Sequence, residues 1–265
     1  TRYHALAVLG KTSPHLAYLN CFSKGRYIAL LHDDSANQYA ELAIVSFDGQ
    51  AFNIAERFAV RGFHTKILRS SIAVNGKEYA VVHNSHGIWL FDIGAEQIRS
   101  VNIEYGCIRE DRVLLVDVEN SLMFAYSKDA PAIVGIIPIS RGDVTIKNVQ
   151  FADAIYVAYS DGNLVCLDGD QYTMQWSENL AEDANIISYK GRIAVIGQDA
   201  VFIDKQRNKE TDQELSGYRF VRYSRLYNHM LLQRRDGKGC AVISSKRTSF
   251  HGIEAPNTPW FTHDS

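Results

Sequence analysis

Residues 155–168 read IYVAYSDGNLVCLD, two apolar runs separated by a short polar turn. The first run (155–158) and the second (164–167) are rich in residues that favour strands. Asp161-Gly162, which lies between them, is typical of a tight hairpin turn. The stretch therefore predicts a buried β-hairpin that closes on Asp168.

The same pattern occurs six times along the chain. We expect the first strands at 27–31, 79–82, 113–116, 155–158, 193–196 and 230–232. The second strands close on a polar residue at Asp48, Asp92, Ser127, Asp168, Asp204 and Ser244. The mean interval of about 39 residues is close to one four-stranded propeller blade, for which about 40–45 residues is usual.

Further apolar runs flank these pairs and complete the blades. Runs such as 66–74 and 184–189 are expected to be inner strands, and 51–55 an outer strand. Helical periodicity is absent, and the strands are continuous apolar runs, which indicates sheets buried on both faces. The sequence predicts an all-β fold, a six-bladed β-propeller that forms a single domain over residues 1–265. We expect the N-terminal strand 3–9 to complete the last blade and close the ring, which removes an exposed sheet edge.

Residues 155–176 also resemble one blade of the PQQ-like, or quinoprotein-type, propeller repeat. They contain an S-x-D-G-x-L-x-x-L-D core that leads to Trp176, and residues 84–92 are a weaker copy. The resemblance implies architecture and no cofactor, because propellers carry many unrelated functions.

Composition excludes several classes of protein. Of 265 residues, 46% are hydrophobic and 22% charged, which is typical of a folded globular protein. The longest uncharged apolar stretch, 130–139, is too short to span a bilayer. The formal charge of -2 argues against nucleic acid as a partner.

The cysteines favour a reducing compartment such as the cytoplasm. Cys21, Cys107, Cys166 and Cys240 are far apart, lie in apolar runs and are expected to be small core residues. The first residues contain neither an initiator Met nor an apolar signal segment, so a removed signal peptide and a periplasmic or secreted location stay open.

One cluster of residues has the composition of a metal site. Three histidines fall at the turns between second and third strands of two neighbouring blades: His32 in one blade, and His83 and His86 in the next. Three imidazoles with nearby carboxylates can bind a metal, but hydrogen-bonded or surface histidines are the simpler expectation. No nucleophile motif is present, so we expect no catalytic residue, metal or cofactor. An enzyme or small-ligand binder that uses the central channel or this His/Asp cluster is the alternative.

Charge distribution is the most informative functional feature. On a propeller, the turns between second and third strands share one rim with the connections between blades. Six carboxylates fall in these turns: Asp33, Asp34, Asp117, Glu119, Asp161 and Asp199. Basic residues predominate in the turns of the opposite face. An acidic rim of this kind would attract a partner with a basic patch.

These features predict a non-catalytic, protein-binding propeller that docks a partner on one loop rim, for example an inhibitory or immunity-type protein. Interfaces expose aromatic residues near their centre, and the candidates on the loops are Tyr39, Phe63 and Tyr105, with Trp260 and Phe261 near the C-terminus. A scaffold of blades within a larger assembly is a further possibility.

Overall fold

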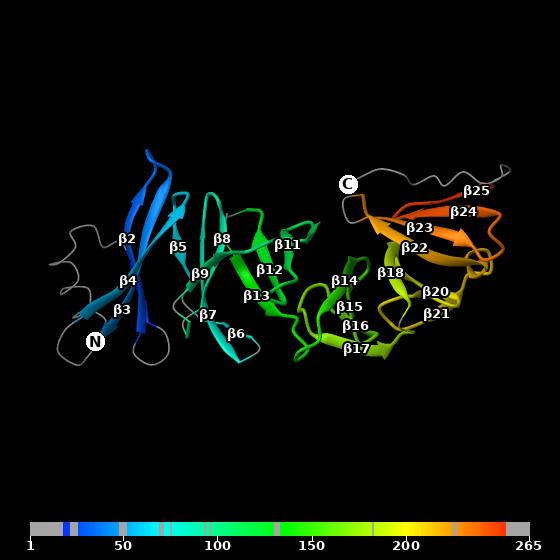
Figure 1. Cartoon of the computed structure of the whole chain (residues 1–265), viewed down its shortest axis with the longest axis horizontal. Coiled ribbons are helices and arrows are strands. Elements are labelled where there is room, and N and C mark those ends of the chain that lie inside the picture. The colour runs from blue at the N-terminus through cyan, green and yellow to red at the C-terminus, as the bar shows by residue number, and fades with distance from the viewer. Residues whose placement is uncertain are drawn as a thin grey trace. The chain divides into compact units, whose positions relative to one another are not determined.

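The computed structural model describes residues 18–21, 26–47, 52–68, 72–74, 76–92, 94–95, 97–129, 133–181, 183–224 and 227–252. These residues form strands β1–β25 and one short 3-10 helix, η2 (Leu215–Gly217) (Figure 1). The chain divides into two compact units, residues 1–143 (unit 1) and 144–265 (unit 2).

Unit 1 contains three antiparallel sheets. The first is β1 (Tyr18–Cys21), β2 (Arg26–Asp34), β3 (Tyr39–Phe47) and β4 (Phe52–Arg61). The second is β5 (Lys66–Ile67), β6 (Ile72–Val74), β7 (Lys77–Asn84), β8 (Gly87–Asp92) and β9 (Gln97–Ser100). The third is β10 (Tyr105–Ile108), β11 (Arg112–Asp117), β12 (Leu122–Ser127) and β13 (Ile133–Pro138).

Unit 2 contains three more sheets. The fourth sheet is β14 (Ile146–Phe151), β15 (Ile155–Tyr159), β16 (Asn163–Leu167) and β17 (Met174–Asn179). The fifth is β18 (Asn185–Tyr189), β19 (Arg192–Ile196), β20 (Ala200–Ile203) and β21 (Lys209–Thr211). The sixth is β22 (Tyr218–Ser224), β23 (His229–Arg234), β24 (Gly239–Ser244) and β25 (Thr248–Gly252).

Each sheet is an antiparallel meander, and we name its successive strands A, B, C and D; in the second sheet β5 and β6 both take the place of strand A. All six predicted hairpins are confirmed as B–C pairs. The inner strand predicted at 66–74 is divided into two strands, β5 and β6. Both pair with β7, but their registers differ by two residues. β5 and β6 are therefore two separate pairing segments at the position of strand A.

Consecutive sheets pack face to face within each unit. In the second sheet, Val82 belongs to a core shared with the first sheet, whereas Val81 belongs to a core shared with the third. In the fifth sheet, Val195 and Ile196 likewise face the fourth and sixth sheets. Both alternate positions of these strands are buried, which explains why they read as continuous apolar runs. The chain is an all-β protein with six blades of the β-propeller type.

The polar residue that marks the repeat has a structural role. The carboxylate of Asp92 accepts hydrogen bonds from the backbone N–H groups of Gly94 and Ala95 in the C–D turn. Asp168 and Asp204 accept pairs of backbone N–H groups in the corresponding turns of the fourth and fifth sheets. The repeat therefore preserves a side chain that satisfies turn N–H groups.

The last sheet has four strands from its own part of the chain, because β25 supplies strand D. Residues 3–9, which were expected to complete this blade, lie outside the described residues. Their pairing and the closure of the ring stay predictions.

A buried polar network joins the inner strands of unit 2. Gln150 of β14 accepts a hydrogen bond from the backbone N–H of Ser188 in β18 and donates to the Tyr223 hydroxyl in β22. Tyr223 donates to Asn228, whose amide donates to the hydroxyl of Ser188. Asn148 donates to the carbonyl of Ile186, which adds a second link between β14 and β18. Specific hydrogen bonds therefore connect three consecutive blades.

Candidate functional site

Hydrogen bonds show which loops share a face of each unit. In unit 1 the connection between the first and second sheets bonds to both neighbouring B–C turns: Gly62 N–H donates to the Gln38 carbonyl, and Ser85 N–H donates to the Phe63 carbonyl. In unit 2, Leu180 of the connection that follows β17 donates to the carbonyl of Gly162 in a B–C turn. B–C turns and D–A connections therefore lie on one side of each unit, as predicted.

The best-defined candidate site on this side belongs to unit 1. It consists of residues 32–39, from the β2–β3 hairpin, and residues 61–65, from the connection between the first and second sheets. We call these two segments the hairpin surface. It contains five residues selected from the sequence: His32, Asp33, Asp34, Tyr39 and Phe63.

Asp34 fixes the tip of the hairpin. Its Oδ1 accepts hydrogen bonds from the backbone N–H groups of Ala36 (2.8 Å) and Asn37 (3.1 Å), and its Oδ2 accepts from Asn37 Nδ2 (2.7 Å). The bonds from the Asn37 side chain and backbone lower the pKa of Asp34 to about 2. The carboxylate is therefore ionised and held in one geometry at neutral pH.

The hairpin is also tied to the connection beside it. The carboxylate of Asp33 accepts from the backbone N–H of Thr65 (2.9 Å) and from its hydroxyl (3.3 Å). Gly62 has φ +106°, and a Cβ at this position would lie 2.4 Å from Oδ1 of Asn84. The connection therefore passes so close to the second sheet that only glycine fits.

Aromatic rings lie next to these carboxylates. Tyr39 is 36% exposed, and its ring centroid lies 5.5 Å from that of His32. Phe63 is half-buried, with its ring 4.6 Å from the exposed ring of His64. The hairpin surface thus presents aromatic and anionic groups on a backbone held by hydrogen bonds.

We expect the Asp34 carboxyl to titrate near pH 2 in the folded protein, well below its ordinary value of 3.8. Because the folded-state pKa is the lower one, the stabilisation is fully present above about pH 4 and is lost as the pH falls towards 2. Carboxyl-carbon NMR titration measures this midpoint. Asn37→Ala removes the amide donor and should raise the midpoint, and a wild-type midpoint near 3.8 would contradict the described turn.

The structure corrects two of the predicted surface residues. Asp117 is fully buried, and Asn120 donates to it from both its backbone N–H and its side-chain amide (2.6 Å). Burial raises the pKa of Asp117, and the two bonds from Asn120 oppose that rise. Tyr105 is buried as well. Tyr105 is the first residue of β10 and Asp117 the last residue of β11, and both side chains point into the fold from these strand ends, so neither is exposed for contact with a partner.

The remaining predicted carboxylates are exposed. Glu119 lies 3.5 Å from Arg99, an ion pair between exposed side chains that is worth little in water. In unit 2, Asp161 accepts from the backbone N–H of Asn163 (2.9 Å), and Asp199 is exposed in the next B–C turn. Each unit therefore carries exposed carboxylates at its B–C turns.

The histidines are placed in three different environments. His83 is buried against Tyr126, and its burial lowers its pKa. His86 is exposed, and His32 lies 3.6 Å from Asp34. Among the described residues, no group of three or more His, Cys, Asp or Glu side chains is arranged to hold a metal ion.

The cysteines agree in part with the expected core positions. Cys166 is buried, whereas Cys107 and Cys240 are half-buried, and all three are free thiols. The side chain of Cys21 lies outside the described part of the chain.

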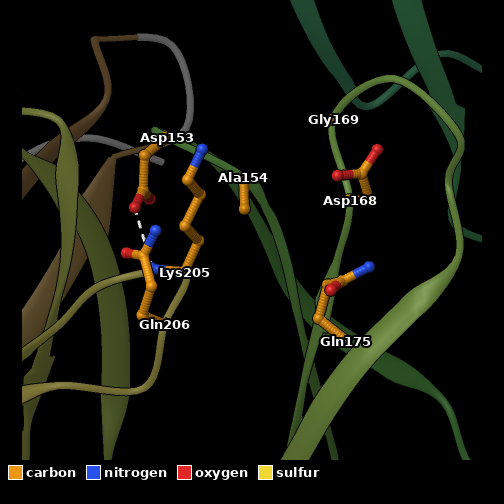
Figure 2. Close-up of a pocket in the computed structure, with 7 residues that line it drawn as sticks. All are labelled: Asp153, Ala154, Asp168, Gly169, Gln175, Lys205 and Gln206. Atoms are coloured by element: carbon orange, nitrogen blue, oxygen red, sulfur yellow. Dashed lines mark hydrogen bonds between the residues drawn. The ribbon is translucent and has the colours of Figure 1, made fainter.

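One feature of unit 2 was not predicted from the sequence. A pocket of about 380 Å³ is lined by Asp153, Ala154, Asp168, Gly169, Gln175, Lys205 and Gln206, and Figure 2 shows these side chains. Trp176, the Trp of the quinoprotein-like segment, packs on Tyr156 and donates to the carbonyl of Lys205 (2.9 Å). This indole docks the fourth sheet onto the fifth beside the pocket. The Asp-Gly and Trp positions were visible in the sequence, but the contribution of the A–B turn at Asp153 was not.

Comparison with known proteins adds little to this description. No protein-family model and no curated protein matches the sequence. The chain is similar to a streptogramin B lyase structure (8% identity, TM-score 0.38, 91% of this chain and 84% of that chain). It is also similar to BamB from Moraxella catarrhalis, with 12% identity and a TM-score of 0.38 over 91% of this chain and 84% of that chain. For the Cps50 (Swd1) β-propeller domain of Myceliophteria thermophila the identity is 11% and the TM-score 0.36, over 91% of this chain and 86% of that chain. With TM-scores below 0.5, the fold assignment rests on the sheets and cores described above.

The described residues contain no helix long and apolar enough to cross a membrane.

Proposed function

We propose that the chain is a non-catalytic, protein-binding β-propeller and that the hairpin surface docks a partner with a basic patch. The observation that carries this proposal is the hydrogen-bonded frame around Asp33 and Asp34, next to the exposed ring of Tyr39. A surface that is already ordered loses little conformational entropy on binding. Tyrosine is enriched among the residues that dominate interface energies.

The charge of the partner follows from the charge of the surface. Asp34 is ionised at every pH above about 3, and Asp33 lies one residue before it. Exposed charges of this kind act mainly on the rate of encounter and lose strength with salt. An inhibitory or immunity-type protein that covers a basic region of its target is one member of this class.

The test begins with capture of partners from the source cell, followed by binding kinetics with the captured partner. Asp33→Asn with Asp34→Asn removes two charges and keeps one side-chain oxygen at each position, which can still accept the backbone N–H bonds. Tyr39→Ala removes the exposed ring. Glu110→Gln with Asp129→Asn is the matched control, since it removes two exposed charges of unit 1 outside the hairpin surface.

We expect a stoichiometric partner that wild type and control retain equally. The double Asn variant should slow association about tenfold at low salt with a smaller effect on dissociation, and Tyr39→Ala should speed dissociation. Reversal of both aspartates to Lys should slow association further. A partner whose binding is indifferent to salt and to these variants would overturn the proposed surface. Recovery of no stoichiometric partner would favour the ligand-binding alternative.

A further inference from the structure

The pocket of unit 2 has the dimensions of a small-molecule site. Its volume of about 380 Å³ lies within the usual range of roughly 300–1,000 Å³. Asp153 comes from the A–B turn of the fourth sheet, Asp168 from its C–D turn, and Lys205 from the C–D turn of the fifth sheet. The pocket therefore lies at the A–B and C–D turns of two neighbouring blades. Its assignment does not rest on the function proposed for the hairpin surface.

The walls of the pocket carry opposite charges. Figure 2 shows Asp168 and Gln175 on one side, and Asp153, Lys205 and Gln206 on the other. The backbone of Lys205 is fixed, because its N–H donates to Asp153 (2.8 Å) and its carbonyl accepts from Trp176. The ammonium of Lys205 makes no hydrogen bond or ion pair with another described residue, so it can bind a ligand from outside.

The pocket is negative overall. Two carboxylates and one ammonium line it, which gives a lining charge of about -1 at neutral pH. The neighbouring thiol of Cys166 experiences the same field, since burial and the charges of Asp153, Asp168 and Asp204 raise its pKa to about 12. A ligand that carries a cationic group complements this lining.

The polar groups define the ligand further. Five of the seven lining residues carry charged or amide side chains, so both donors and acceptors face the pocket. The described lining residues include no aromatic ring, so they offer no stacking surface for a flat or sugar-like ligand. The complementary ligand is small and strongly polar, with a cationic group and an anionic group at opposite ends.

We propose that this pocket binds a basic amino acid, either free or as the C-terminal residue of a polypeptide. The cationic side chain faces Asp168, the carboxylate pairs with Lys205, and the amides of Gln175 and Gln206 bind the remaining polar atoms. Both sources present the same guanidinium or ammonium and the same free carboxylate.

L-arginine, agmatine and citrulline are the probes, with binding followed by calorimetry and backbone NMR shifts. Agmatine lacks the carboxylate, and citrulline lacks the cation. For a ligand of this size, we expect L-arginine to bind with low-millimolar Kd. Asp168→Asn keeps a side-chain oxygen for the turn N–H groups of residues 170 and 171. It should weaken L-arginine and agmatine by about fivefold each.

Lys205→Met should change the affinities for L-arginine and agmatine in opposite directions. It should weaken L-arginine, because the carboxylate loses its partner, and strengthen agmatine, because a like charge is removed. Asp170→Asn, in the same turn but outside the lining, is the matched control and should change neither. A peptide that ends in a free arginine, compared with its amidated form, separates the two sources.

Three results would overturn the proposal. The first is the absence of saturable L-arginine binding up to tens of millimolar. The second is binding that is unchanged by Asp168→Asn. The third is agmatine or citrulline binding as tightly as L-arginine to the wild-type protein.

Discussion

Replacement of Gln150 by Leu should lower the free energy of unfolding by about 3–5 kcal/mol, since each buried polar group left without a partner costs about 1–3 kcal/mol. Gln150 is 2% exposed and bonds to Asn148, Ser188 and Tyr223. A leucine of similar volume leaves the backbone N–H of Ser188 and the side-chain amide oxygen (Oδ1) of Asn148 without these bonds. Urea denaturation of the full chain measures the effect.

Tyr223→Phe is the matched control for this network. It removes the hydroxyl that Gln150 and Asn228 share but keeps the ring in place. The expected loss is smaller, about 1–2 kcal/mol, because the ring still packs and fewer buried groups lose partners. If Gln150→Leu unfolded at the wild-type urea concentration, the network would not be a major source of cohesion between the blades of unit 2.

Replacement of Gly62 by Ala should cost about 2–4 kcal/mol, the sum of a strained left-handed backbone and a steric clash. The new Cβ would lie 2.4 Å from Oδ1 of Asn84. That side chain cannot move freely, because it donates to the carbonyl of Arg61 (3.0 Å) and accepts from the N–H of His86 (2.8 Å). Thermal and urea unfolding measure the loss, and NMR shifts of residues 32–39 report on the hairpin surface.

Two further variants separate the backbone strain from the clash. Gly142 also has positive φ (+57°), but nothing lies within 4 Å of the position of a Cβ, so Gly142→Ala should cost only about 1 kcal/mol. Asn84→Ala combined with Gly62→Ala should be more stable than the sum of the single losses predicts, since the clash is then absent. Strict additivity of the two losses would exclude the clash as a cause.

The repeat was predictable from the sequence because its signals are local. A strand buried on both faces reads as an apolar run, as at 155–158 and 193–196. In three of the six blades the turn after the pair has an aspartate that accepts backbone N–H groups, and Asp92, Asp168 and Asp204 therefore recur near multiples of the blade period. Neither signal depends on which other part of the chain lies nearby.

The candidate binding surface was predictable only in part. Asp33 and Tyr39 of the hairpin are exposed and Asp34 is half-buried, whereas Asp117 and Tyr105 are buried, because a residue at a strand end can point into the fold or out of it. A pattern of residue types does not contain that direction. The D-x-x-N spacing shared by residues 34–37 and 117–120 indicates the same turn in both places but not the burial of either one.

Sequence alone determined the all-β class, the six hairpins and the loops that share a face, because strand periodicity and turn chemistry act over a few residues. Tertiary structure decided the rest. The pocket of Asp153, Asp168 and Lys205 joins residues up to 52 positions apart, and a single hydrogen bond of the network around Gln150 spans 73 positions. Such contacts arise only when neighbouring sheets pack face to face, and the depth of that packing determines whether a carboxylate is held in a core or presented to a partner.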